Sequence, residues 1–116
     1  MLDKVKAYLK HLELACSYAE DIAEELVKAL KPIIPDIKYS IGWEEGGIDE
    51  ICFYSKTRNI VAKSESEGLT VSLRELIEEA IPELQGHVDT PFGVYLTKEE
   101  AEQAKSILSK LREGLK

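Results

Sequence analysis

The sequence is poor in the residues that most often carry metal binding and nucleophilic catalysis. Its 116 residues include two cysteines, Cys16 and Cys52, and two histidines, His11 and His87. No CxxC pair and no HExxH-type spacing is present, so the sequence predicts neither a metal site nor a cofactor. Each cysteine falls inside a predicted helix or strand, so we expect reduced core residues rather than a disulfide framework.

Long apolar runs are also missing. No stretch approaches the 18 or so apolar residues of a membrane span, and the first residues, MLDKVKAYLK, lack the apolar run of a signal peptide. We therefore expect no membrane partner and a cytoplasmic location.

Positive charge and side-chain amides are both scarce. The formal net charge of -7 opposes nucleic-acid binding, because a phosphate backbone needs a basic face. Gly46-Gly47 fits neither phosphate-binding glycine pattern and predicts a turn. Asn and Gln total three against 17 Glu and 12 Lys, a composition typical of heat-adapted proteins.

What is present predicts one folded domain over residues 1–116. Hydrophobic residues make up 44% and charged residues 32% of the chain, which is typical of globular proteins. Residues 2–30 contain no glycine or proline, and their apolar residues recur every three or four positions. This pattern predicts a helix over 2–31, ended by Pro32.

The rest of the chain predicts an α+β fold. Alternating apolar residues indicate a strand meander over 37–63. Ser72-x-x-Glu75 predicts the start of a short helix over 72–81, and Thr97-x-x-Glu100 that of a helix over 98–114. Between them we expect an irregular loop at 85–93 and a strand at 94–96. The order is α-β-β-β-α-β-α, with the N-terminal and C-terminal helices packed on a small, mainly antiparallel sheet.

The loop at 85–93 is the segment with the most site-like composition. A loop can direct His87 and Asp89 into a cleft as an acid/base pair, with Trp43, Tyr54 and Thr90 lining a ligand pocket. The same residue types also build turns, since Asp and Thr side chains bond to local backbone. The turn is the favoured interpretation, so no catalytic residue is assigned.

Carboxylates crowd the first predicted hairpin, namely Asp36, Glu44, Glu45, Asp49 and Glu50. Converging oxygens could hold a divalent cation, but the spacing matches no EF-hand loop. Charges that keep an exposed hairpin soluble explain them more simply.

The predicted N-terminal helix carries a second apolar row. At about 1.5 Å per residue its length is about 43 Å, longer than the roughly 35 Å diameter of a compact domain of this size. Opposite its core-facing side, Ala7, His11, Leu14 and Tyr18 recur at helical spacing. Such a row is either scattered exposure, which is normal, or an oligomer contact.

These observations favour a small accessory or regulatory protein–protein interaction module that self-associates through its N-terminal helix. One alternative is a small enzyme or ligand-binding domain with a pocket near 85–93. A nucleic-acid binder is a third, in which Lys4, Lys6, Lys10, Lys56 and Arg58 would have to share a face.

Overall fold

The computed structural model describes residues 16–42, 50–60 and 68–113. Helix α2 spans Cys16–Leu30, and its buried residues Ile22, Ala23, Leu26 and Leu30 follow the helical spacing. The peptide N–H groups of Ile33 and Ile34 donate to the Leu30 carbonyl at 3.0 and 2.9 Å and close the helix in a turn. Of the helix expected over 2–31, residues 2–15 lie outside the described residues.

A three-stranded sheet lies over α2. Strands β1 (Lys38–Gly42) and β2 (Glu50–Tyr54) are antiparallel. Strand β4 (Val88–Asp89) pairs with the other side of β2 in parallel, so the sheet order is β1-β2-β4. Because successive side chains of a strand point to opposite faces, Ile51, Phe53 and Val88 lie on the inner face and are buried.

Strand β4 is a difference from the expected architecture, since it lies within the segment expected to be an irregular loop. The N–H of Ile51 donates to the His87 carbonyl at 2.8 Å, and Val88 is buried against the core. A strand of two residues carries no readable alternation, and its pairing with β2 comes from a distant part of the chain. The third strand of the expected meander, 59–63, is also different: Asn59 bridges Val94, and residues 61–63 lie outside the described residues.

A second, two-stranded antiparallel sheet joins β3 (Val71–Ser72) to β5 (Tyr95–Leu96). Helix α3 (Leu73–Ala80) follows β3 directly, and a 3-10 turn, η2 (Pro82–Leu84), ends that segment. Helix α4 (Lys98–Glu113) begins at the expected capping box: the Thr97 N–H donates to Glu100 Oε1 at 3.0 Å, and the Glu100 N–H donates to Thr97 Oγ1 at 3.2 Å. The Ser72 side chain forms no capping hydrogen bond with the described first turn of α3.

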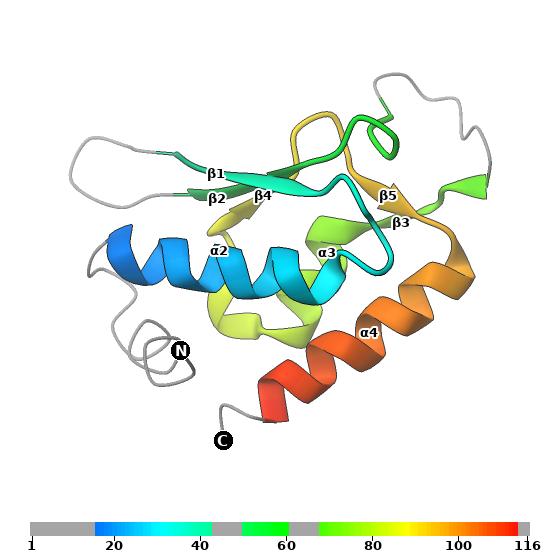
Figure 1. The fold of residues 1–116 in the computed structure, drawn as a ribbon. Coiled ribbons are helices and arrows are strands. Elements are labelled where there is room, and N and C mark those ends of the chain that lie inside the picture. Colours follow the sequence, from blue (N-terminus) through cyan, green and yellow to red (C-terminus); the bar gives the residue numbers. More distant parts are fainter. Residues whose placement is uncertain (1–15, 43–49, 61–67, 114–116) are drawn as a thin grey trace.

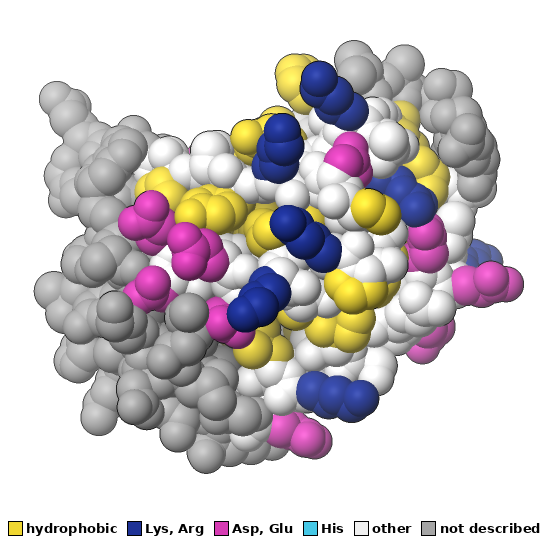
Figure 2. Space-filling model, in the orientation of Figure 1, with side chains coloured by type: hydrophobic (Ala, Val, Ile, Leu, Met, Phe, Trp, Pro, Cys, Tyr) yellow, Lys and Arg dark blue, Asp and Glu magenta, His cyan; other side chains and the backbone are white. Residues whose placement is uncertain are grey.

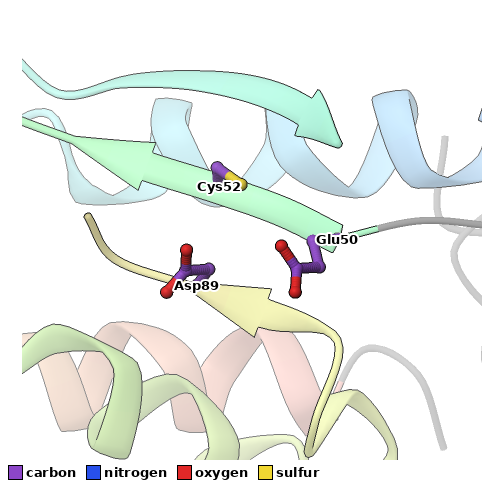
Figure 3. Close-up of side chains that lie close together, drawn as sticks. All are labelled: Glu50, Cys52 and Asp89. Atoms are coloured by element: carbon purple, nitrogen blue, oxygen red, sulfur yellow. The ribbon is translucent and has the colours of Figure 1, made fainter. Parts of the chain in front are cut away.

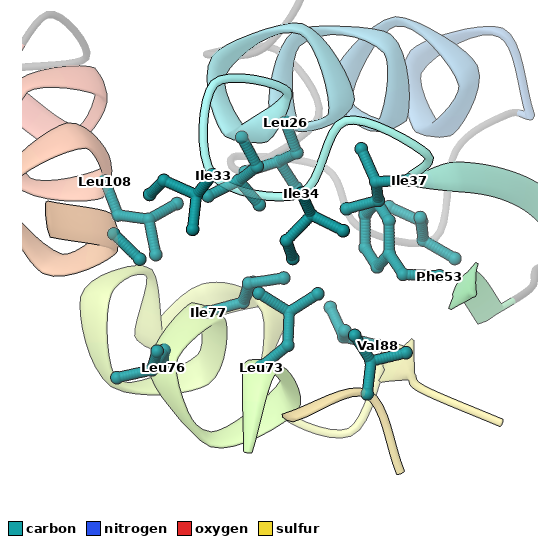
Figure 4. Packing of buried hydrophobic residues seen from close by; sticks show 14 of the residues in the cluster. Leu26, Ile33, Ile34, Ile37, Phe53, Leu73, Leu76, Ile77, Val88 and Leu108 are labelled. Atoms are coloured by element: carbon teal, nitrogen blue, oxygen red, sulfur yellow. The ribbon is translucent and has the colours of Figure 1, made fainter. Parts of the chain in front are cut away.

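The hydrophobic core lies between the inner face of the three-stranded sheet and the helices. Leu26 of α2, Ile77 of α3, Leu108 of α4 and Phe53 of β2 belong to one cluster of buried side chains there (Figure 4). Helices α2, α3 and α4 all lie on one side of this sheet (Figure 1). No described helix covers its outer face, which we call the open face.

The expected α+β class and element order are confirmed, with β4 as one further strand between α3 and α4. Within the described ranges, no helix is both long enough and apolar enough to cross a membrane.

Candidate functional site

The open face carries the polar half of the strand alternation. Its side chains come from every second residue: Lys38, Ser40 and Gly42 of β1, Glu50, Cys52 and Tyr54 of β2, and Asp89 of β4. The register places Ser40, Cys52 and Asp89 in one row across the three strands. Lys38 stands opposite Tyr54 at one end, and Gly42 stands opposite Glu50 at the other.

Glu50, Cys52 and Asp89 form an acid–thiol cluster on this face (Figure 3). One ligand atom of each lies within 4.8 Å of the others. Burial raises the pKa of the Cys52 thiol, and the negative charges of Asp89 and Glu50 raise it further, against a hydrogen bond with Ser40 that lowers it. The thiol is therefore held in its protonated form at neutral pH.

The donor types of the cluster suit a thiophilic divalent cation, but a structural zinc site takes four ligands and the cluster offers three among the described residues. Neighbouring acids are common on protein surfaces without an ion. The arrangement therefore defines a site that attracts a cation without specifying a metal.

Cys52 corrects one expectation from the sequence. Its thiol is free, as expected, but it is half-buried on the open face and does not belong to the core. The alternation already contained this signal, because Ile51 and Phe53 on either side of Cys52 are the core residues. The side chain of Cys16 lies outside the described residues.

The opposite end of the open face is aromatic and basic. Tyr54 is 37% exposed and Phe92 is 66% exposed, and they are the large exposed hydrophobic side chains of the described residues. Lys38 stands opposite Tyr54 in the strand pair, Lys56 follows Tyr54 by two residues in the chain, and both lysines are exposed. We call Lys38, Tyr54, Lys56 and Phe92 the aromatic end. Figure 2 shows Lys or Arg side chains next to hydrophobic ones along the upper edge of the molecule, where the sheet lies in Figure 1.

Phe92 sits in an unfavourable backbone conformation. The Gly93 N–H donates to the Thr90 carbonyl at 2.9 Å, which closes a four-residue turn with Pro91 in its second position. Phe92 occupies the third position with φ 61°, as in a type II turn, where glycine is normally found. Left-handed backbone costs a residue with a Cβ about 1 kcal/mol or more, so the fold holds this aromatic ring in solvent at a cost.

Two polar contacts fix the turn beneath the aromatic end. Asp36 accepts hydrogen bonds from the hydroxyls of Ser55 (2.7 Å) and Thr57 (2.9 Å) and from the amides of Lys56 (3.0 Å) and Thr57 (3.2 Å). Burial acts to raise the pKa of Asp36, but these hydrogen bonds outweigh it and lower the pKa from 3.8 to about 2. Asp36 is therefore a structural anchor rather than an exposed charge of the hairpin.

Arg58 makes the second contact, a two-pronged ion pair with Glu100 at 2.5 Å for each oxygen. Burial raises the pKa of Glu100, but the bonds from Arg58 and Thr97 dominate and lower it. The Arg58 carbonyl also accepts the Tyr95 N–H at 3.1 Å, and the Gly93 carbonyl accepts the Ile60 N–H at 3.2 Å. The turn at 55–60 is thus held beside the Phe92 turn. Because Arg58 is occupied by Glu100, it is not a free cation for nucleic acid.

The predicted site residues that the structure describes lie in or next to strands β2 and β4. Asp89 belongs to the acid–thiol cluster, and its carboxylate accepts the Thr90 N–H at 2.9 Å. His87 is half-buried at the start of β4. Thr90 is 8% exposed, whereas Tyr54 lies on the open face, and Trp43 lies outside the described residues.

Two hollows on the described surface lie away from the 85–93 segment. One, of about 210 Å³, lies between α3 and α4 and is lined by Leu76, Glu79, Ala80, Lys105, Ser109 and Arg112. The other is lined by Gly68, Thr70, Thr97, Lys98 and Glu99. Of the helix row, Ala7, His11 and Leu14 lie outside the described residues, as does the side chain of Tyr18.

Comparison with known proteins adds no functional information: family models, curated proteins and solved structures all give no match to this chain.

Proposed function

We propose that this protein is a small interaction module that docks another polypeptide on its open sheet face, with the aromatic end as the principal contact. The observation that carries the proposal is Phe92. An aromatic ring that is 66% exposed and held there by a left-handed backbone conformation is unfavourable twice over for the isolated domain. Strain of this kind is concentrated at binding and catalytic positions.

Docking of a partner buries the Phe92 ring, and the free energy gained offsets part of the cost of its exposure and of its backbone strain. Complete burial of a phenylalanine side chain contributes about 1.5–3 kcal/mol, and aromatic residues dominate the binding energy of many protein interfaces. Tyr54 adds a second ring whose hydroxyl can remain hydrated at the rim. Lys38 and Lys56 supply positive charge at this end, which favours a partner surface with negative charge.

Photo-crosslinking tests the proposal in the source cells. The photoreactive amino acid p-benzoylphenylalanine replaces Phe92 in one variant and Gln103, an exposed residue of α4, in a matched control. We expect a discrete crosslinked polypeptide from position 92 and none from position 103. No product at position 92, or the same product from both positions, would contradict the proposal.

Phe92→Gly separates binding from folding. Glycine removes the ring and also relieves the positive φ, so the free energy of unfolding should stay equal or rise by about 1 kcal/mol. Binding should weaken at the same time. A variant that loses stability together with binding would show that Phe92 serves the fold instead.

Three expectations from the sequence remain proposals alongside this one. The helix row that ends at Tyr18 remains a separate candidate contact, tested by light scattering on Leu14→Glu/Tyr18→Glu. A reducing, cytoplasmic location agrees with the free thiol of Cys52. A thermophilic source agrees with the composition, and thermal unfolding would test it.

A further inference from the structure

The open face has a positive charge at one corner and negative charges toward the diagonally opposite corner. Lys38 lies on the edge strand β1 at the end of the face where β1 begins. The acid–thiol cluster lies on β2 and β4, in the rows beyond it. The Glu50 carboxylate lies on the Asp89 side of β2 (Figure 3), and its Oε2 is also 3.7 Å from the position that a Cβ on Gly42 would occupy.

Neither charge is neutralised by an ion pair within the described part of the chain. The ion pairs of Arg58, Arg74 and Lys105 involve none of Lys38, Glu50 and Asp89. One face thus carries an unpaired cation and, a few residues away, a cluster that attracts a cation.

We propose that the occupant of the open face is a second copy of this chain, docked face to face about a twofold axis that lies parallel to the sheets. The inference rests on the proposed function, since it names the partner of that same surface. A twofold contact requires a surface that is complementary to itself. With the axis running diagonally between Lys38 and the acid–thiol cluster, Lys38 of each copy lies over Glu50 and Asp89 of the other.

In this arrangement Lys38 of each copy pairs with the acid–thiol cluster of the other copy, which gives two symmetric contacts between opposite charges. The strands of the two sheets then cross at a large angle, as in orthogonal sheet packing. The lysine ammonium takes the place of the cation that the acid–thiol cluster would attract. Tyr54 and the Phe92 turn extend the contact beyond the polar rows.

The dimension of the face predicts a weak dimer. Strands β1 and β2 contribute five residues each and β4 contributes two. At about 3.3 Å per residue and about 4.8 Å between strands, these residues cover about 190 Å². This is below the roughly 800 Å² per partner of a stable interface. We therefore expect rapid, concentration-dependent exchange between monomer and dimer, measurable between about 20 µM and 1 mM.

Charge exchange tests the pairing. Variant one is Lys38→Glu, which makes both ends acidic, and variant two is Glu50→Lys/Asp89→Asn, which makes both ends basic. By sedimentation equilibrium, each variant alone should dimerise with a Kd at least about tenfold higher than the wild type. An equimolar mixture should recover a heterodimer within about threefold of the wild-type Kd. Lys110→Glu, an exposed residue of α4, makes the same charge change away from the face and should leave Kd unchanged.

The outcomes separate this inference from the proposed function. A wild type that stays monomeric at 1 mM, variants that dimerise like the wild type, or a mixture that does not recover would each overturn the twofold pairing. In any of these cases, a crosslink from position 92 to a different protein would leave the proposed function standing. If Glu50→Lys/Asp89→Asn fails to fold by circular dichroism, Glu50→Gln keeps the test, with a smaller expected rise in Kd.

Discussion

Removal of the Asp36 carboxylate should destabilise the domain in a pH-dependent way. Four hydrogen bonds converge on this side chain from the turn at 55–57, and Ser55, which supplies one of the donors, is only 1% exposed. A buried group that loses its partner costs about 1–3 kcal/mol. We expect Asp36→Ala to lower the free energy of unfolding by about 2–3 kcal/mol at pH 7.

The pKa gives a second route to the magnitude. A decrease from 3.8 to about 2 corresponds to roughly 2 kcal/mol, and solvent screening of this half-buried carboxylate reduces it to about 1 kcal/mol. Because the folded pKa is the lower one, this stabilisation is complete above pH 4 to 5 and is lost as the pH falls toward 2. By pH 3 about half of it is gone.

Asp36→Asn is the matched control. Its amide oxygen can still accept from the two backbone N–H groups, and its NH2 can donate to the hydroxyls, so we expect a loss of only about 1 kcal/mol at pH 7. Urea unfolding of the three proteins at pH 7, 4 and 3 measures the difference. Equal losses of unfolding free energy for Asp36→Ala and Asp36→Asn at pH 7 would refute the role of the Asp36 hydrogen bonds. A difference between Asp36→Asn and the wild type that does not narrow at pH 3 would refute the role of its charge.

Three further predictions concern other parts of the same framework. Glu100→Gln breaks the ion pair with Arg58 and weakens the capping box of α4, so it should lower the free energy of urea unfolding by about 1–2 kcal/mol. An equal loss of stability for Glu99→Gln, at the exposed neighbouring residue, would contradict this. Gly93→Ala should cost about 2–3 kcal/mol, because a Cβ there would lie 2.3 Å from Cε2 of Tyr95 at φ +69°. At Gly86 φ is +84°, but an added Cβ would have nothing within 4 Å, so Gly86→Ala should lower the free energy of unfolding by only about 1 kcal/mol. A larger destabilisation by Gly86→Ala than by Gly93→Ala in thermal unfolding would contradict this. Iodoacetamide should alkylate Cys52 slowly at pH 8 in a Cys16→Ser background, because the raised pKa of the thiol leaves little thiolate. Asp89→Asn should accelerate this alkylation. An unchanged rate would show that the Asp89 carboxylate does not act on the thiol.

Local sequence patterns predict the structure correctly where the contacts join residues that are close together in the chain. Thr97 and Glu100 have the spacing of a capping box and form one. Ser72 and Glu75 have the same spacing, yet the Ser72 side chain forms no cap. Strand β3 ends at Ser72 and runs directly into α3, so the strand pairing determines the entry to that helix.

The candidate site could not be predicted in this way, because it depends on pairing between distant segments. The acid–thiol cluster exists only because β4 pairs in parallel with β2 and places Asp89 beside Cys52. Only the outward direction of Cys52 was present in the alternation. Phe92 was equally hidden, since the Pro-Phe-Gly sequence suggests glycine for the left-handed position, whereas both Phe92 and Gly93 take positive φ.

Docking of a second copy on the open face is tested most directly by backbone NMR of the wild type over a range of concentrations. Between about 20 µM and 1 mM, the amide signals that shift should be those of Lys38, Ser40, Cys52, Tyr54 and Phe92, with α4 unchanged. Shifts confined to the helices, or a spectrum that does not change with concentration, would contradict docking of a second copy on this face.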